Sequence, residues 1–158
     1  MKKAIICFMI TCLLFSLCAC GGKTETAVPE IPEKETIDFQ SVLDECKIEC
    51  SGDFEKYKKE QKRDLLTIDD IGGLYVSKDG KSMMFNSGGE NEYDYKKGFR
   101  WTLLGAVFKK LDISSATVAK ITNTRAIDGT QTDENDKIKL TWTYHPDNGL
   151  SIIFEKKG

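Results

Sequence analysis

The sequence predicts an α+β domain in which an antiparallel sheet of about four strands packs against helices on one face. Two observations support this fold class. Residues 74–85 and 138–154 each hold two β-prone runs around a turn sequence, which is typical of a β-hairpin. Before and between these hairpins, apolar residues recur at spacings of three and four, as on one face of a helix. The 158 residues are 40% hydrophobic and 30% charged, which suits one such domain.

Two helices are expected before the first hairpin. The first is predicted from Asp38 to Glu49, and the second from Phe54 to Leu66, after a break at Ser51-Gly52-Asp53. Asp53 is expected to cap the second helix, because its carboxylate can accept the free backbone N–H groups at a helix start. A single bent helix is the alternative. The residues expected to face the core are Phe39, Val42, Leu43, Cys46, Phe54, Tyr57, Leu65 and Leu66, with Cys50 as a further candidate.

The first hairpin, residues 74–85, is expected to turn at Asp79-Gly80, because glycine supplies the positive φ that a tight turn needs. Residues 87–92 then read as a loop. A core helix is predicted from about Lys97 to Leu111. Its apolar stripe is expected to comprise Trp101, Leu104, Val107, Phe108 and Leu111.

A short helix through Ile121 should follow, with Ser114 or Ser115 as its cap. Asp128-Gly129 is expected to turn the chain, and residues 130–136 to form a polar connector. The second hairpin is the clearest element, because Ile138, Leu140, Trp142 and Tyr144 alternate strictly with polar residues. Such alternation gives a strand one buried face and one wet face.

The first nineteen residues differ from the rest of the chain. Met1-Lys2-Lys3 is basic, and residues 4–17 form an apolar stretch shorter than the roughly 20 residues that span a bilayer. This pattern predicts a signal peptide over residues 1–19, with an uncleaved membrane helix as the alternative. The stretch ends in Leu17-Cys18-Ala19-Cys20-Gly21, which resembles the lipobox of bacterial lipoproteins.

That resemblance implies cleavage before Cys20 and acylation of its sulfur, as by palmitate. The protein would then sit in the cell envelope, anchored by lipid to the extracytoplasmic face of the cell membrane. Residues 20–35 contain two prolines and no apolar periodicity, and they are read as a tether of some tens of Å. A single domain is expected over residues 36–158.

Two stretches near the C-terminus, residues 124–131 and 142–150, resemble parts of small uncharacterised lipoproteins of Gram-positive bacteria. The resemblance covers the C-terminal third of the chain. It implies the same compartment and an α+β architecture, and it implies no reaction.

Charge argues against a nucleic-acid partner. Residues 1–19 contain two lysines and no acid, so the remainder carries 21 basic and 25 acidic residues, a formal net charge of −4. The one basic run, residues 56–63, is interrupted by an acid and reads as a solvated helix surface.

Few residues are candidates for chemistry, and the sequence predicts neither catalysis nor a cofactor. Cys46 and Cys50 remain as thiols after processing and are candidates for a disulfide, since they lie one turn apart on a helix. His145 is the single histidine, and it precedes a proline in a turn. Residues 128–136 supply oxygen ligands for a weak calcium site, without the pattern of an EF-hand loop.

The sequence therefore favours a non-enzymatic binding module that meets an envelope protein or peptide. Its expected contact surface is the outward face of the last hairpin: Lys139, Thr141, Thr143, Ser151 and Ile153. The alternative is a small-ligand carrier or envelope enzyme, with a pocket between sheet and helices around Trp101, Trp142 and Tyr144.

The lipid anchor can be tested directly. Cys20→Ser should leave the precursor without acyl chains and move the protein from the detergent phase to the aqueous phase on phase partitioning. Cys18→Ser is the matched control and should stay in the detergent phase. Unchanged partitioning of Cys20→Ser, or an intact leader in the mass of the mature protein, would contradict the assignment.

Overall fold

A computed structural model describes residues 36–89 and 94–157, with backbone alone for residues 94–97. The predicted signal peptide and tether lie outside the described residues. Among those that are described, no helix has the length and apolar content to cross a membrane. The elements along the chain are α1 (Phe39–Glu49), α2 (Ser51–Gln61), α3 (Ile68–Ile71), β1 (Leu74–Val76), β2 (Ser82–Asn86), α4 (Asp94–Lys110), α5 (Ser115–Thr122), the 3₁₀ turn η1 (Ala126–Asp128), β3 (Gln131–Glu134), β4 (Ile138–His145) and β5 (Gly149–Lys156).

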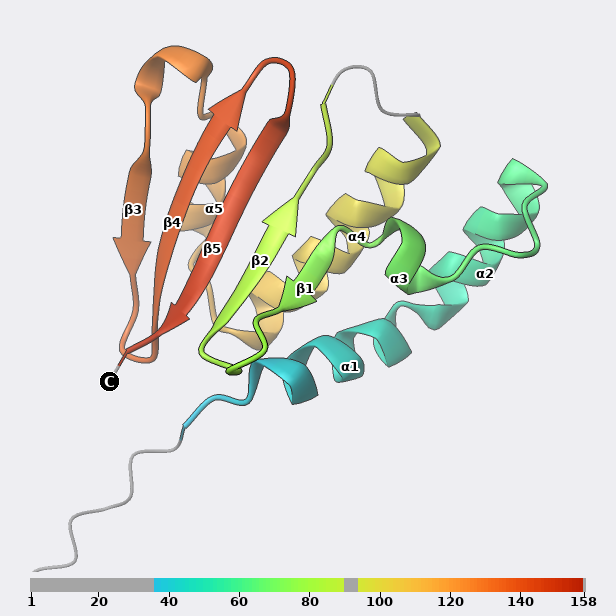
Figure 1. The fold of residues 1–158 in the computed structure, drawn as a ribbon, viewed down its shortest axis with the longest axis horizontal. Coiled ribbons are helices and arrows are strands. Elements are labelled where there is room, and N and C mark those ends of the chain that lie inside the picture. The colour runs from blue at the N-terminus through green and yellow to red at the C-terminus, as the bar shows by residue number, and fades with distance from the viewer. Residues whose placement is uncertain (1–35, 90–93, 158) are drawn as a thin grey trace, which may run out of the picture. The chain divides into compact units, whose positions relative to one another are not determined.

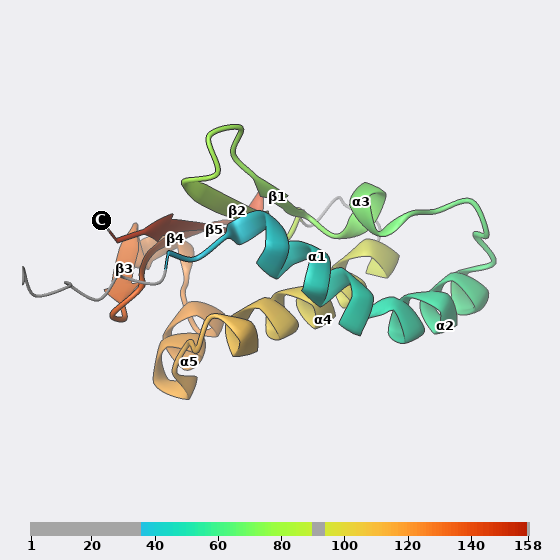
Figure 2. The ribbon, with the colours of Figure 1, turned by 90° about the horizontal axis from the view of Figure 1, so that it is seen from below.

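The strands form one antiparallel sheet of five in the order β1-β2-β5-β4-β3, which confirms the predicted α+β class (Figure 1). Each predicted hairpin forms, and β2 pairs with β5 to join the two. Figure 2 shows α1, α4 and α5 on one side of this sheet. The core lies between, because alternate strand residues such as Phe85, Trp142, Ile152 and Phe154 point to the helices and are buried.

The first helix matches its prediction, and the second differs. Asp38 caps α1 by accepting the N–H of Gln40 at 3.0 Å. The predicted break at residues 51–53 is absent, because these residues form the first turn of α2. The interruption is limited to Cys50, whose N–H still bonds to the carbonyl of Cys46. The expected capping by Asp53 is therefore wrong. The helix ends at Gln61, and Leu65 is 97% exposed rather than buried.

The predicted stripe of α4 is largely correct, with one exception. Leu104, Val107, Phe108 and Leu111 are buried as predicted, whereas Trp101 is 39% exposed. Trp101 lies on the margin of the stripe, where its ring meets the edge of Phe85 with centroids 5.9 Å apart. In α5 the predicted cap is confirmed, because Ser114 accepts the N–H of Thr117 at 3.1 Å.

The expected polar connector at residues 130–136 is wrong, because it contains the fifth strand, β3. Strand propensity is weak in Gln131–Glu134, so pairing with β4 and side-chain contacts hold it instead. The carboxylate of Asp133 accepts hydrogen bonds from Thr117 and Lys120, both at 2.9 Å, and thereby ties the strand to α5. A polar sequence can occupy this position because β3 is an edge strand.

A close backbone contact joins the loop after β2 to the start of β5. The hydroxyl of Ser87 accepts the N–H of Leu150 at 2.8 Å, and the N–H of Ser87 reaches the carbonyl of the same residue at 2.9 Å. Gly149 has φ of +75°, and a Cβ added there would overlap the carbonyl oxygen of Gly88. A side chain at this position would push the two segments apart.

Gly149→Ala should lower the free energy of unfolding by about 3 kcal/mol, because it adds a backbone clash to the cost of a positive φ. Gly80→Ala is the matched control. Gly80 also has positive φ, at +65°, but a Cβ added there would have no atom within 4 Å. It should cost about 1 kcal/mol. Urea denaturation measures both values, and equal losses would show that the contact at Gly149 is not tight.

Candidate functional site

The sheet has an open face, opposite the helices, and its side chains form rows that run across the strands. Residues at paired positions of neighbouring strands lie side by side on the same face. The row through the middle takes one residue from each strand, and we call it the central row: Tyr75, Met84, Ile153, Thr141 and Thr132.

Two further rows flank the central row on the same face. The amide–hydroxyl row consists of Asn86, Ser151 and Thr143. The charged row, on the other side, consists of Ser82, Glu155, Lys139 and Glu134. The central and amide–hydroxyl rows contain no acidic or basic side chain, although 30% of the chain is charged.

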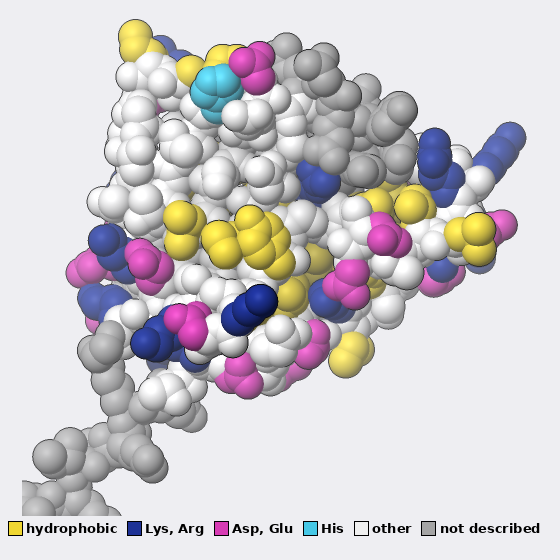
Figure 3. All heavy atoms as spheres, in the orientation of Figure 1, with side chains coloured by type: hydrophobic (Ala, Val, Ile, Leu, Met, Phe, Trp, Pro, Cys, Tyr) yellow, Lys and Arg dark blue, Asp and Glu magenta, His cyan; other side chains and the backbone are white. Residues whose placement is uncertain are grey.

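The middle of this face is apolar and accessible. Tyr75 is 52% exposed and Ile153 is 37% exposed, and Met84 between them is partly exposed. Figure 3 views this face: hydrophobic side chains gather over the middle of the sheet, uncharged surface lies around them, and charged side chains follow the lower edge. The open face therefore offers an apolar centre with uncharged hydrogen-bonding groups on one side and charged groups on the other.

The sequence predicted part of this surface. Lys139 and Thr143 are exposed and Thr141 and Ser151 are partly exposed, and the β4–β5 register places all four on the open face with Ile153. Sequence reasoning missed the contributions of β1, β2 and β3, which are Tyr75, Met84, Asn86 and Thr132. The alternation in Met83-Met84-Phe85 signals that Met84 points outward, but nothing local indicates that β2 lies beside β5.

Cys46 and Cys50 are both free thiols on the buried side of the α1–α2 junction, with exposures of 0% and 4%. Burial raises the pKa of the Cys46 thiol to about 11, and the neighbouring Cys50 adds to the effect. Burial also raises the pKa of Cys50. Because the thiolate is the reactive form, both thiols are unreactive in the folded protein.

Three of the four carboxylates in residues 128–136, the segment considered for calcium, are paired with cations. Asp128 lies 3.1 Å from Arg125, Asp133 lies 2.9 Å from Lys120, and Glu134 lies 3.0 Å from Lys157. The hydrogen bond from Lys120 is the main cause of a lowered pKa at Asp133. In residues 36–89 and 94–157, no three metal-ligating side chains gather as a metal site requires.

His145 lies at the end of β4, in the turn where sequence reasoning expected it. Its ring Nδ1 accepts the backbone N–H of Asp147 at 3.1 Å, and the imidazole is largely exposed. This bond has a structural role, because it closes the turn between β4 and β5.

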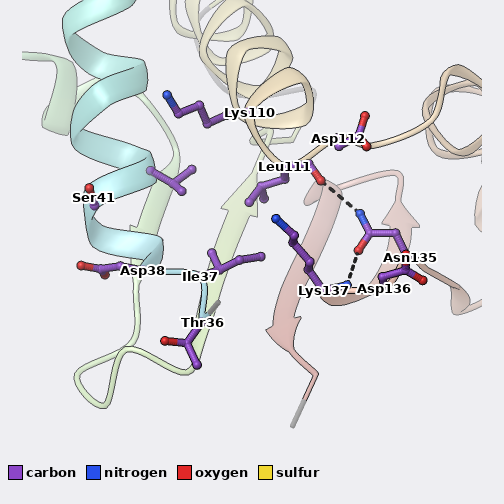
Figure 4. A pocket seen from close by; sticks show the side chains of 11 residues that line it. Thr36, Ile37, Asp38, Ser41, Lys110, Leu111, Asp112, Asn135, Asp136 and Lys137 are labelled. Atoms are coloured by element: carbon purple, nitrogen blue, oxygen red, sulfur yellow. Dashed lines mark hydrogen bonds between the residues drawn. The ribbon is translucent and has the colours of Figure 1, made fainter. Parts of the chain in front are cut away.

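A hollow of about 500 Å³ lies between the start of α1, the end of α4 and the β3–β4 turn (Figure 4). Asn135 shapes its wall, since its amide donates to the carbonyl of Leu111 at 3.0 Å and its oxygen accepts the N–H of Lys137 at 3.0 Å. Lys110 on the rim is paired with Glu45, which lowers the pKa of that carboxyl. The rim carries both signs of charge.

The aromatic residues expected around an inner pocket have separate roles. Trp142 is 2% exposed and its indole N–H donates to the hydroxyl of Thr124 at 2.8 Å. It touches a smaller hollow of about 320 Å³ beside α5 and β3. Trp101 lies on the margin of α4, and Tyr144 packs against the core.

No family model, curated protein or solved structure matches this chain. Its function is therefore inferred from the residues and their placement.

The state of the two cysteines can be measured. At pH 8 the folded protein should be alkylated by iodoacetamide about 100-fold more slowly than the urea-unfolded chain, because a thiol with pKa near 11 holds about 100-fold less thiolate than one near 9. The native rate should rise with pH up to about 11. Equal alkylation rates in native buffer and in urea would contradict the burial of the two thiols. If the chain is not alkylated in urea unless a reductant is present, the two cysteines form a disulfide.

Proposed function

We propose that this protein is a lipoprotein, anchored at the extracytoplasmic face of the membrane, and that it acts as a non-enzymatic module that binds a protein through the open face of its sheet. One observation carries the proposal: the central row and the amide–hydroxyl row form a continuous accessible surface without acidic or basic side chains. Charged side chains ordinarily cover a solvated sheet face, so this surface is set apart from its surroundings.

The composition of the surface fits a protein partner. The centre of a protein interface is depleted in charged residues and enriched in aromatic residues and Met, and a polar rim surrounds it. Tyr75 and Met84 match that centre, and the hydroxyl groups of Thr143 and Ser151 match the rim. The part of the partner that meets this centre should also be uncharged, because a charge buried without its own partner is costly.

The lipobox-like sequence at Cys20 supports the anchoring. A flexible chain as long as the proposed tether, residues 21–35, has a root-mean-square reach of about 20 Å, which would keep the domain close to the bilayer. Restriction to this layer raises the effective concentration of any partner held at the same membrane. At this higher effective concentration, a small contact surface is sufficient for binding.

One observation supports the alternative function, a carrier of a small ligand. The hollow beside Asn135 has a volume in the range of small-molecule sites. Its rim carries charges of both signs, and one of its cations, Lys110, is already paired with Glu45. The open face therefore supports the binding module better.

Site-specific photo-cross-linking tests the proposal in the lipidated full-length protein. A photoreactive residue at position 153 should form one reproducible adduct with an envelope protein. The same residue at position 127 is the matched control, because Ile127 is 83% exposed and lies outside the open face. Tyr75→Asp should weaken binding roughly 30-fold, the loss for a hot-spot residue worth about 2 kcal/mol, and so abolish the adduct.

Thermal unfolding provides the stability control for Tyr75→Asp, since the exposed position should tolerate the change. Identical adducts from positions 153 and 127, or an adduct at 153 that survives Tyr75→Asp, would overturn the proposed role of the open face.

A further inference from the structure

We infer that the protein bound by the open face is a second copy of this chain, held at the same membrane. The inference rests on the proposed function, because it assigns the partner of the same surface. Its basis is self-complementarity: a two-fold symmetric contact presents the same patch from both sides, so the patch must tolerate meeting itself.

Charge makes most of this protein unsuited to such a contact. The chain after the predicted leader has a formal net charge of −4, and like charges placed opposite one another cost several kcal/mol. The central row avoids this cost because none of its five residues is acidic or basic. Two copies can therefore stack the apolar residues of one row on those of the other.

The rows also fix the direction of the two-fold axis. With the axis along the central row, each member of that row faces its own counterpart, and the charged row of one copy faces the amide–hydroxyl row of the other. Glu155 and Lys139 then lie opposite Ser151 and Thr143. If the axis ran along β5 instead, Glu155 of one copy would face Glu155 of the other. The pattern of charge favours the axis along the row.

The size of the surface explains why the contact needs the membrane. Five strands about 4.8 Å apart, with three rows about 6.8 Å apart, cover roughly 500 Å² per copy. A stable complex in solution buries about 800 Å² per partner. The dimer should therefore be weak in dilute solution, and it should form where lipid anchors raise the local concentration.

The test uses a cysteine on the predicted axis of the lipidated protein in phospholipid vesicles. Ile153→Cys should give a covalent dimer with a short bismaleimide, because residue 153 faces its own counterpart. Two controls should give at least fivefold less dimer: Ile127→Cys, which is exposed but off the face, and the unsubstituted chain, whose Cys46 and Cys50 are buried.

A charge-swap experiment tests the axis itself. In the Ile153→Cys background, Tyr75→Lys and Tyr75→Asp should each reduce the dimer yield at least fivefold, because each places two like charges opposite one another. A 1:1 mixture of the two variants should restore the yield to within twofold, as a lysine then meets an aspartate. A mixture no better than either variant alone would overturn the inferred arrangement.

The outcomes separate this inference from the proposed function. Adducts from position 153 with a different protein, and none with a second copy, would overturn the dimer and leave the binding module standing. Equal dimer yields from positions 153 and 127 would show random collision and overturn the dimer. Absence of any adduct at position 153, in vesicles and in native membranes, would overturn both.

Discussion

The pairing of β2 with β5 is the contact on which the rest of the structure depends. Each hairpin is a local unit, and two-stranded hairpins are marginal in water by themselves. When Met83 pairs with Phe154 and Phe85 with Ile152, the two hairpins become one sheet with a continuous apolar face. The same register brings Met84 beside Ile153 on the opposite face. One set of backbone bonds therefore builds the core and aligns the open face.

The helices decide which face stays open. α1 and α4 supply apolar stripes that include the buried Leu43 and Leu104, and both helices lie on one side of the sheet (Figure 2). No described residue forms a second layer on the other side, so alternate strand residues there meet water. A solvated face normally carries charge. Lys139 and Glu155 follow that rule. Met84 and Ile153 depart from it, and with Tyr75 they form the apolar centre on which the proposed binding role rests.

Local patterns account for the elements that sequence reasoning placed correctly. Asp38 caps α1, the turn at Gly80 has positive φ, and Trp142 alternates with exposed neighbours, because each depends on residues close in sequence. The errors have a common cause in distant contacts. β3 is a strand because β4 lies beside it and α5 holds Asp133, which its own four residues do not reveal. The open face was half predicted for the same reason, since Tyr75 and Met84 join it only through the β2–β5 register.

The distribution of charge fits the lipid anchor that we propose. A domain with net negative charge keeps copies of itself apart in solution, and a neutral patch of modest size does not overcome that repulsion when the protein is dilute. The proposed anchor would change this balance, because confinement to a membrane would reduce the entropic cost of bringing two surfaces together and leave the patch to set their orientation. A larger or more apolar patch would bind before export and expose the unanchored chain to aggregation. A small uncharged face on a charged domain is the arrangement expected of a contact that should form only after anchoring.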